Sequence, residues 1–166
     1  LAVRRQRQMC IRDRIYRELY KKGLTGEELG SIITDMEMVD PFSVNGVLDT
    51  AAWARTGTTG PTVGEALLRA GHKLRRADKN RVQGKIQIHE YLKVRESGRP
   101  KLQIFNTCPN LIRELQSIPL SKTNPEDVDT HASDHAYDAL RYMIMSRPRM
   151  DSPLERLRGI KRDIFK

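Results

Sequence analysis

Residues 126–138 read EDVDTHASDHAYD, the densest acidic cluster of the chain, and the last five of them open a predicted helix from Asp134 to about Ser146. Asp134 and Asp138 are four residues apart, so on a helix they share a face, and Arg141 follows three residues later on that face. Like charges one turn apart destabilise a helix slightly unless a cation lies between or beside them. A cation between or beside the two carboxylates would offset this repulsion.

Two interpretations of this helix start stay open. In the first, Asp134 and Asp138 bind a metal ion. In the second, Asp134 only caps the helix or interacts with its dipole, and Asp138 pairs with Arg141 or Tyr142. Both place carboxylates at the beginning of the helix, and they differ in what those carboxylates contact.

A third carboxylate follows a predicted strand. Asp49 ends the short apolar run at 44–48, which is typical of a buried strand. Carboxylates from a strand end and a helix start, in a positively charged protein, suit Mg²⁺ or Mn²⁺ held next to a bound phosphate. An ordinary turn residue is the alternative interpretation of Asp49.

Strand and helix patterns alternate along the chain of 166 residues, a length that suits one domain. The predicted strands are RIYRELY at 14–20, the run at 44–48 and KLQIF at 101–105. The predicted helices begin at a Thr25 cap with Glu28 three residues on, in the first turn at Pro61, at an Asp78 cap and at a Thr107 cap. Gly84 lies inside the third of these, where glycine disfavours a helix. The alternation predicts an α/β fold with helices layered on a sheet.

The net charge of +9, with 20 Arg against 10 Lys, indicates a polyanionic partner such as double-stranded DNA. Seven cations in the expected helical region are candidates for contacts with the DNA backbone, and a solvated surface is their alternative role. They are Arg69, Lys73, Arg75, Arg76, Lys79, Arg81 and Lys85. No apolar run reaches 18 residues and no signal peptide pattern is present, so we expect no membrane partner and a cytoplasmic location.

Neither the two terminal segments nor the cysteine and histidine residues form a further candidate site. Residues 7–14 read RQMCIRDR, which resembles translated adapter sequence, so we expect a non-native or disordered segment over residues 1–13, with a functional basic arm as the alternative. Residues 148–166 form a basic tail.

Two cysteines without CxxC spacing exclude a disulfide framework, and Cys108 is expected to be a buried, unreactive thiol. His131 and His135 are four apart, but the pattern offers no third zinc ligand.

Several of these motifs together resemble the C-terminal nuclease domain of the large terminase subunit of tailed bacteriophages. The matching segments are DTHASDHAYDALRYMIM, GVLDTAAWARTGTTGPTVGEAL, ADKNRVQGKIQIHEYLKV, PKLQIFNTCPNLIRELQSIP and RIYRELYKKGLTGEELG, in the family's order, from about Arg14 to Arg147. The resemblance implies a nuclease domain over 14–147 with a ribonuclease H-like mixed sheet flanked by helices, lacking its first strand. It also implies a metal-dependent endonuclease that cuts concatemeric phage DNA during packaging.

Three acidic positions bind metal in that family. The resemblance assigns the second to Asp49 and the third to Asp134, with Asp138 as a supporting or additional catalytic ligand, and it implies two Mg²⁺ or Mn²⁺ ions. The first acid belongs to a strand upstream of RIYRELY, and the surroundings of Asp13 do not match that strand. We therefore expect weakened metal binding and a fragment that lacks full activity. The chain contains no GxxxxGK[ST] motif for the family's ATPase motor.

The resemblance further implies the portal protein and the small terminase subunit as partners of the full-length protein, in the host cytoplasm. Two other functions stay open. One is a basic DNA-binding or docking fragment without catalysis, in which the carboxylates are structural. The other is a different ribonuclease H-like nuclease, such as a resolvase or transposase.

Overall fold

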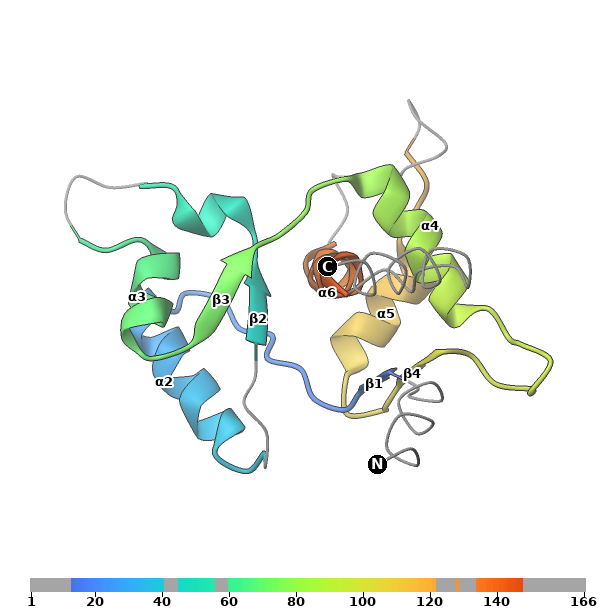
Figure 1. The fold of residues 1–166 in the computed structure, drawn as a ribbon, viewed down its shortest axis with the longest axis horizontal. Coiled ribbons are helices and arrows are strands. Elements are labelled where there is room, and N and C mark those ends of the chain that lie inside the picture. The colour runs from blue at the N-terminus through green and yellow to red at the C-terminus, as the bar shows by residue number, and fades with distance from the viewer. Residues whose placement is uncertain (1–12, 41–44, 56–59, 122–127, 129–133, 148–166) are drawn as a thin grey trace, which may run out of the picture.

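A computed structural model describes residues 13–40, 45–55, 60–121, 128 and 134–147. The described chain forms strands and helices in alternation, and Figure 1 shows them in two groups with α6 (His135–Ser146) seen end-on between them. One group holds α2 (Gly26–Glu37), β2 (Asn45–Leu48), α3 (Val63–Arg69) and β3 (Lys73–Arg76). The other holds β1 (Asp13–Ile15), α4 (Arg81–Leu92), β4 (Leu102–Ile104) and α5 (Pro109–Ser117). The predicted α/β class is confirmed.

The strands pair in two separate parallel ladders. β2 pairs with β3, with Asn45 opposite Lys73 and Leu48 opposite Arg76. β1 pairs with β4, with Asp13 opposite Leu102. Parallel neighbours need a crossover connection, and α3 supplies it between β2 and β3. Because the carboxyl end of β2 is followed by Asp49, this ladder carries one of the predicted carboxylates at its edge.

Four helix starts are predicted before α6, and of these the first is confirmed and the second needs a small correction. Thr25 and Glu28 form the expected capping box, with the Thr25 hydroxyl accepting from the Glu28 N–H at 3.2 Å and the Glu28 carboxylate accepting from the Thr25 N–H at 2.8 Å. The next helix begins at Val63, not at Pro61, because Thr62 and Glu65 form a second capping box there. In both cases local side-chain hydrogen bonds fix the first turn.

The other two starts were predicted at the wrong residue. Asn80, not Asp78, caps α4, since its Oδ1 accepts from the Gln83 N–H at 3.0 Å. Thr107 does not cap α5: its hydroxyl donates to the Tyr16 carbonyl at 2.6 Å. The N-terminus of α5 is capped from another part of the chain, by Glu18, whose carboxylate accepts from the backbone N–H groups of residues 110 and 111.

The strand predictions also need correction. The strand expected at 14–20 is limited to Asp13–Ile15, because only these residues pair with β4. Residues 73–76, expected in a helical basic region, form β3 instead. The neighbouring strand explains the difference, since Leu74 packs closely over Gly46 of β2.

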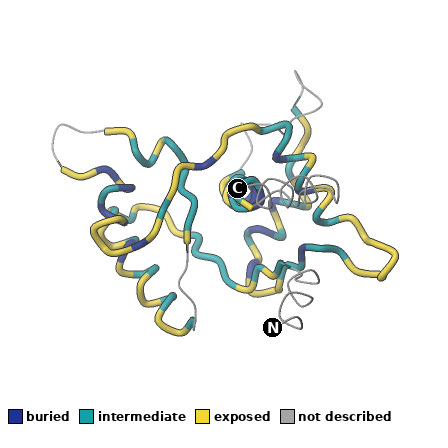
Figure 2. The backbone as a smooth tube through the Cα atoms, in the orientation of Figure 1, coloured by how far each residue is buried: buried dark blue, intermediate teal, exposed yellow. Residues whose placement is uncertain are grey.

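The main core lies where α4, α5 and α6 meet β4, and Figure 2 shows buried stretches on these helices as well as on α3. It is built from apolar side chains of each element, including Ile88, Leu102, Leu111, Leu140 and Ile144. Cys108 lies fully buried within it, and burial raises the pKa of its thiol, as expected for an unreactive cysteine. None of the described helices has the length and apolarity that spanning a membrane requires.

Two helices cross closely at a glycine. A Cβ built on Gly84 of α4 would lie 2.4 Å from Cγ of Arg141 on α6. The glycine that disfavours a helix in the sequence is therefore the residue that lets α6 approach α4. This approach brings the carboxylates of α6 beside the segment that joins β3 to α4.

Candidate functional site

Asp49 lies where β2 ends and a 3-10 turn, η1 (Thr50–Trp53), begins. Its Oδ1 accepts a hydrogen bond of 2.8 Å from the Ala51 backbone N–H, so the carboxylate caps this turn. The Lys79 ammonium, from the segment between β3 and α4, lies 3.0 Å from the same oxygen. Asp49 is thus a turn residue, as one interpretation had it, and also faces the helix that carries the other carboxylates.

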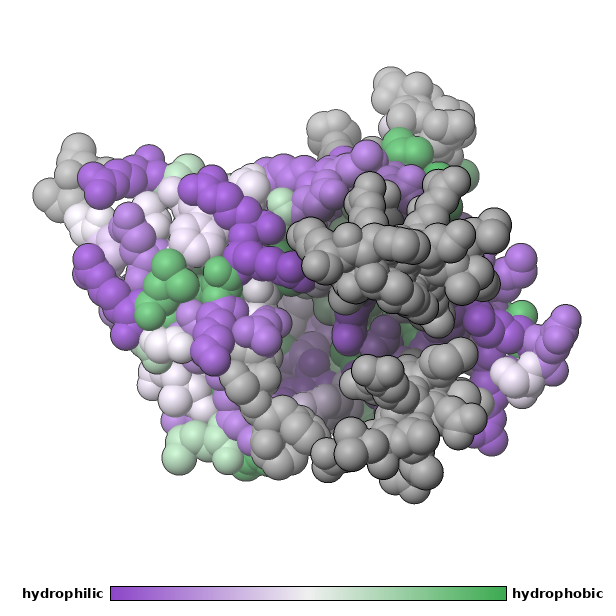
Figure 3. Space-filling view, viewed as in Figure 1, coloured by the Kyte–Doolittle hydropathy of each residue, from purple (hydrophilic) through white to green (hydrophobic). Residues whose placement is uncertain are grey.

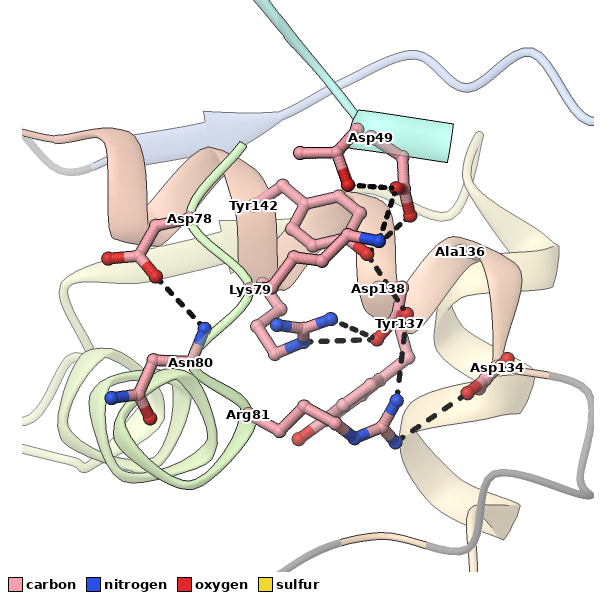
Figure 4. A network of polar contacts seen from close by, with 12 residues as sticks. Asp49, Asp78, Lys79, Asn80, Arg81, Asp134, Ala136, Tyr137, Asp138 and Tyr142 are labelled. Carbon is pink, nitrogen blue, oxygen red and sulfur yellow. Dashed lines mark hydrogen bonds and ion pairs between the residues drawn. The ribbon is translucent and has the colours of Figure 1, made fainter. Parts of the chain in front are cut away.

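Tyr142 of α6 connects Asp49 to Asp138, as Figure 4 shows. The tyrosine hydroxyl donates to Asp49 Oδ2 at 2.6 Å, and Asp138 Oδ2 lies 3.4 Å from the same hydroxyl. Tyr142 follows Asp138 by one helical turn, which puts both on the face that meets the end of β2. Sequence reasoning named Tyr142 only as a partner of Asp138 and missed its bond to Asp49, because that contact joins positions 93 residues apart.

The hydrogen bonds set the charges of this group. Desolvation by itself raises the pKa of the Asp49 carboxyl, but the bonds from Tyr142 and Ala51, together with the Lys79 ammonium, lower that pKa from 3.8 to about 2. Burial, with the neighbouring carboxylates of Asp49 and Asp138, raises the pKa of the Tyr142 hydroxyl above its ordinary value. At neutral pH Asp49 is therefore charged and Tyr142 is a proton donor.

Asp138 pairs with a buried guanidinium. Arg141 is 2% exposed, and its Nε and Nη2 lie 3.0 and 2.9 Å from Asp138 Oδ1. The guanidinium also stacks on the Tyr142 ring at 4.5 Å from its centroid. The interpretation in which Asp138 pairs with Arg141 or Tyr142 is confirmed for both partners. Because Arg141 uses only Oδ1, the second oxygen of Asp138 faces Tyr142 and Arg81.

Asp134 occupies the N-cap position of α6 but makes no side-chain cap hydrogen bond. Its carboxylate lies 3.8 Å from Nη2 of Arg81, whose Nη1 is 3.9 Å from Asp138. Burial and the negative charge of Asp138 raise the pKa of Asp134, partly offset by Arg81. The hypothesis that Asp134 caps the helix with its side chain is therefore wrong.

Glu114 of α5 caps α6 in place of Asp134. Its Oε2 accepts from the backbone N–H groups of Ala136 and Tyr137 at 2.7 and 2.9 Å. Sequence reasoning did not single out Glu114. The available signal was a carboxylate three residues after Leu111 and four before Ile118, on the apolar face of its helix, where an acidic residue needs buried donors.

The seven basic candidates do not share one helical face. Side chains alternate along β3, so Lys73 and Arg75 point to the opposite face from Arg76, which stacks on Trp53 at 5.5 Å. Lys79 and Arg81 contact the carboxylates described above. The remaining candidates are Arg69 in the last turn of α3 and Lys85 in α4. Figure 3 shows hydrophilic residues over much of this side, along β3 and the segment after it.

The donor set fits a hard divalent cation in its chemistry, because Asp49, Asp134 and Asp138 supply carboxylate oxygens. Asp134 and Asp49 lie at the two ends of the group, with Asp138 between them. Within the described part of the chain, no three His, Cys, Asp or Glu side chains gather closely enough to form a metal-binding group. His131 lies outside the described residues, so the His131 and His135 pair is not placed.

Asp13 lies near the opposite end of α6 from Asp134. Its Oδ1 accepts from Arg147 at 2.9 Å, at the C-terminal end of α6, whereas Asp134 precedes the first residue of that helix. A helix of 12 residues is about 18 Å long.

The chain was compared with known proteins. No protein-family model, no curated protein and no solved structure matches it.

Proposed function

We propose that residues 14–147 are a metal-dependent endodeoxyribonuclease domain of the phage terminase type. One observation carries the proposal: Asp49, Asp138 and Asp134, from a strand end and a helix start, lie along one side of α6 together with Tyr142, Lys79 and Arg81. Carboxylates and cations from distant segments on one surface suit a site that binds both a divalent cation and a phosphodiester.

Each side chain has a role in this proposal. Asp49 and Asp138 hold the divalent cation, Asp134 adds a carboxylate one turn away, and Tyr142 fixes the orientation of the first two by its hydroxyl. Bound Mg²⁺ or Mn²⁺ ions supply an activated water and stabilise the leaving 3′-oxygen when a phosphodiester is hydrolysed. With a cation held by Asp49, the exposed Lys79 ammonium would pair with a phosphate of the bound DNA.

The fold proposal is a ribonuclease H-like sheet whose first strand lies upstream of the matched residues. The two strand pairs support it because both flank Ala139 and Met143 of α6, across two cavities of about 670 and 400 Å³. A strand in this space would unite the pairs in one sheet. We expect a chain extended by its upstream reading frame to bind Mn²⁺ more tightly, and an unchanged affinity in a calorimetric titration would argue against the missing strand.

Nicking of supercoiled plasmid in the presence of Mn²⁺ tests the activity. We expect cleavage that EDTA abolishes and that Asp134→Asn and Asp49→Asn each reduce at least about 100-fold, because a metal site loses a charged ligand. Asp35→Asn, the same change at an exposed position of α2, is the matched control and should cleave like the unmodified chain. Undiminished cutting by Asp134→Asn would overturn the assignment.

A second function, DNA binding without catalysis, has an observation in its favour. All three carboxylates already have a basic partner, since Lys79 contacts Asp49, Arg81 contacts Asp134 and Arg141 contacts Asp138. In that case DNA affinity falls steeply with salt and is the same in Mn²⁺ and in EDTA. The plasmid assay, combined with a binding measurement, separates the two functions.

The wider setting follows only from the resemblance. As part of the proposal, the substrate is concatemeric phage DNA in the host cytoplasm, and the portal protein and small terminase subunit are partners of the full-length protein. Recovery of the flanking reading frame tests this directly, because an ATPase motor upstream separates a terminase from a resolvase or transposase.

A further inference from the structure

Glu114 is a carboxylate buried at the junction of three segments. It is 1% exposed, on α5, and its Oε1 accepts a hydrogen bond of 3.0 Å from the Tyr20 hydroxyl. Its Oε2 accepts from the N–H groups of Ala136 and Tyr137, the second and third residues of α6. These are the two N–H groups that the side chain of an N-cap residue normally satisfies.

The residue at the N-cap position of α6 is Asp134, a type that caps helices well. With both of its usual donors taken by Glu114, the Asp134 carboxylate lies instead 3.8 Å from Arg81, on the side of the helix that carries Asp138. Asp134 thus stands at the position from which a side chain normally reaches these donors, while Glu114 occupies them.

We propose that Glu114 is a positioning residue that takes over the cap of α6 and thereby keeps the Asp134 carboxylate available to a divalent cation. The metal-binding half of this inference rests on the proposed function. The capping half rests only on the hydrogen bonds of α6.

A competition between two caps predicts non-additive effects on stability. In the unmodified chain Asp134→Ala removes no cap, so its effect on Tm is small. In Glu114→Ala the vacated N–H groups turn to Asp134, and a second change of Asp134 to Ala then leaves the helix without any cap. We expect the cost of Asp134→Ala to grow by about 2–4 °C in the Glu114→Ala background, the amount typical of one N-cap in a chain of this size. The measurement is the thermal unfolding of the four variants of this cycle. Additive shifts in Tm would overturn the inference.

Glu114→Gln keeps the size of the buried side chain and serves if Glu114→Ala does not fold. Gln retains one weaker acceptor, so Asp134 competes better for the donors, and the coupling with Asp134→Ala should have the same sign.

Hydrogen exchange of the Ala136 and Tyr137 amides gives a second readout. These amides should stay protected in Glu114→Gln and lose protection only when Asp134 is also replaced. Full loss of protection in Glu114→Gln alone would contradict a cap by Asp134.

Binding of Mn²⁺, measured by calorimetry, tests the positioning role. We expect Glu114→Gln to weaken Mn²⁺ binding about 10-fold, because residues that orient a metal ligand typically have effects of this size. Glu18→Gln is the matched control, because Glu18 caps α5 in the same way, from another segment of the chain. It should lower Tm and leave Mn²⁺ affinity unchanged. Equal losses of affinity in both variants would show a merely structural role.

Failure of the proposed function gives a different result from failure of this inference. If the unmodified chain binds no Mn²⁺ and the stability cycle is non-additive, the proposed metal chemistry fails and the competition between the two caps stands. If the chain binds Mn²⁺ and the cycle is additive, Glu114 does not control Asp134 and the nuclease proposal is unaffected.

Discussion

Asp49 shows how one carboxylate acquires several constraints from different parts of the chain. The turn after β2 supplies the Ala51 N–H, α6 supplies the Tyr142 hydroxyl, and the segment before α4 supplies the Lys79 ammonium. Each of these donors interacts better with the charged carboxylate than with the neutral acid. Folding therefore favours the ionised form of Asp49.

The pH dependence of stability follows from this preference. The pKa of Asp49 is lowered from 3.8 to about 2, so its contribution is fully present above about pH 4 and is lost as the pH falls toward 2. Its side chain is 37% exposed, and with solvent screening we expect a contribution of about 1 kcal/mol. Urea unfolding at pH 7, 4 and 3 measures the free energy of unfolding. Its decrease on acidification should be smaller in Asp49→Asn than in the unmodified chain. Asp35→Asn is the control, and an equal decrease in the free energy of unfolding in Asp49→Asn and Asp35→Asn would contradict the prediction.

The hydroxyl of Tyr142 can be tested without changing the ring. Tyr142→Phe removes the donor shared by Asp49 and Asp138, and we expect a loss of about 1–2 kcal/mol in the free energy of unfolding at pH 7. The pKa of Asp49 should rise in this variant, as NMR titration of its carboxyl can show. Tyr91→Phe, a half-buried ring beside Lys101, is the matched control and should lose less than about 0.5 kcal/mol. Equal effects of the two changes would argue against the bridge.

At the scale of elements, the crossing of α4 and α6 places the basic segment after β3 beside the acidic face of α6. The crossing depends on Gly84, where Cγ and Cδ of Arg141 occupy the space that a side chain would take. Arg141 in turn pairs with Asp138. Helix packing and the geometry of the candidate site therefore depend on the same residue.

Gly84→Ala separates helix propensity from packing. Propensity alone predicts a gain of about 1 kcal/mol for this change in a helix. The added Cβ would lie 2.4 Å from Arg141, and overpacking of this kind costs about 1–3 kcal/mol. We expect net destabilisation in urea unfolding, whereas Glu90→Ala at an exposed position of α4 should stay within about 0.5 kcal/mol. A stabilised Gly84→Ala variant would show that the Arg141 side chain moves aside at little energetic cost.

At the scale of the whole molecule, the seven basic candidates are distributed over several elements, in place of the helical basic region expected from the sequence. β3, the segment after it and the end of α3 each contribute cations, and Lys79 of the segment after β3 contacts Asp49. A duplex bound there would contact several elements at once. Nonspecific, salt-dependent affinity is the expected result for contacts to phosphates.

Salt titration of DNA binding tests this distribution. We expect Lys79→Ala and Arg76→Ala each to weaken binding of a random-sequence duplex and to reduce the slope of log affinity against log salt by about 1. Lys93→Ala, an exposed cation just after α4, should leave the slope unchanged. Fluorescence anisotropy at several salt concentrations measures all three variants. Identical slopes would place the bound DNA elsewhere.

The sequence by itself determined the features that depend on neighbouring residues. Alternating patterns gave the α/β class, the Thr25 capping box fixed α2, and the helix that begins after Asp134 was placed to within a residue. Spacing also put Asp138, Arg141 and Tyr142 on one helical face. These predictions succeed because hydrogen bonds and side-chain contacts within one or two turns involve residues close in sequence.

Only the tertiary structure decided which donors and acceptors meet. Glu114, not Asp134, caps α6, and Glu18, not Thr107, caps α5, because both capping carboxylates come from other segments. Residues 73–76 form a strand because they pair with β2, and their local sequence pattern does not indicate that pairing. Asp49 and Tyr142 form the shortest link of the candidate site although 93 residues separate them. Contacts of this kind depend on how the elements pack, and local periodicity cannot encode which buried polar groups packing will bring together.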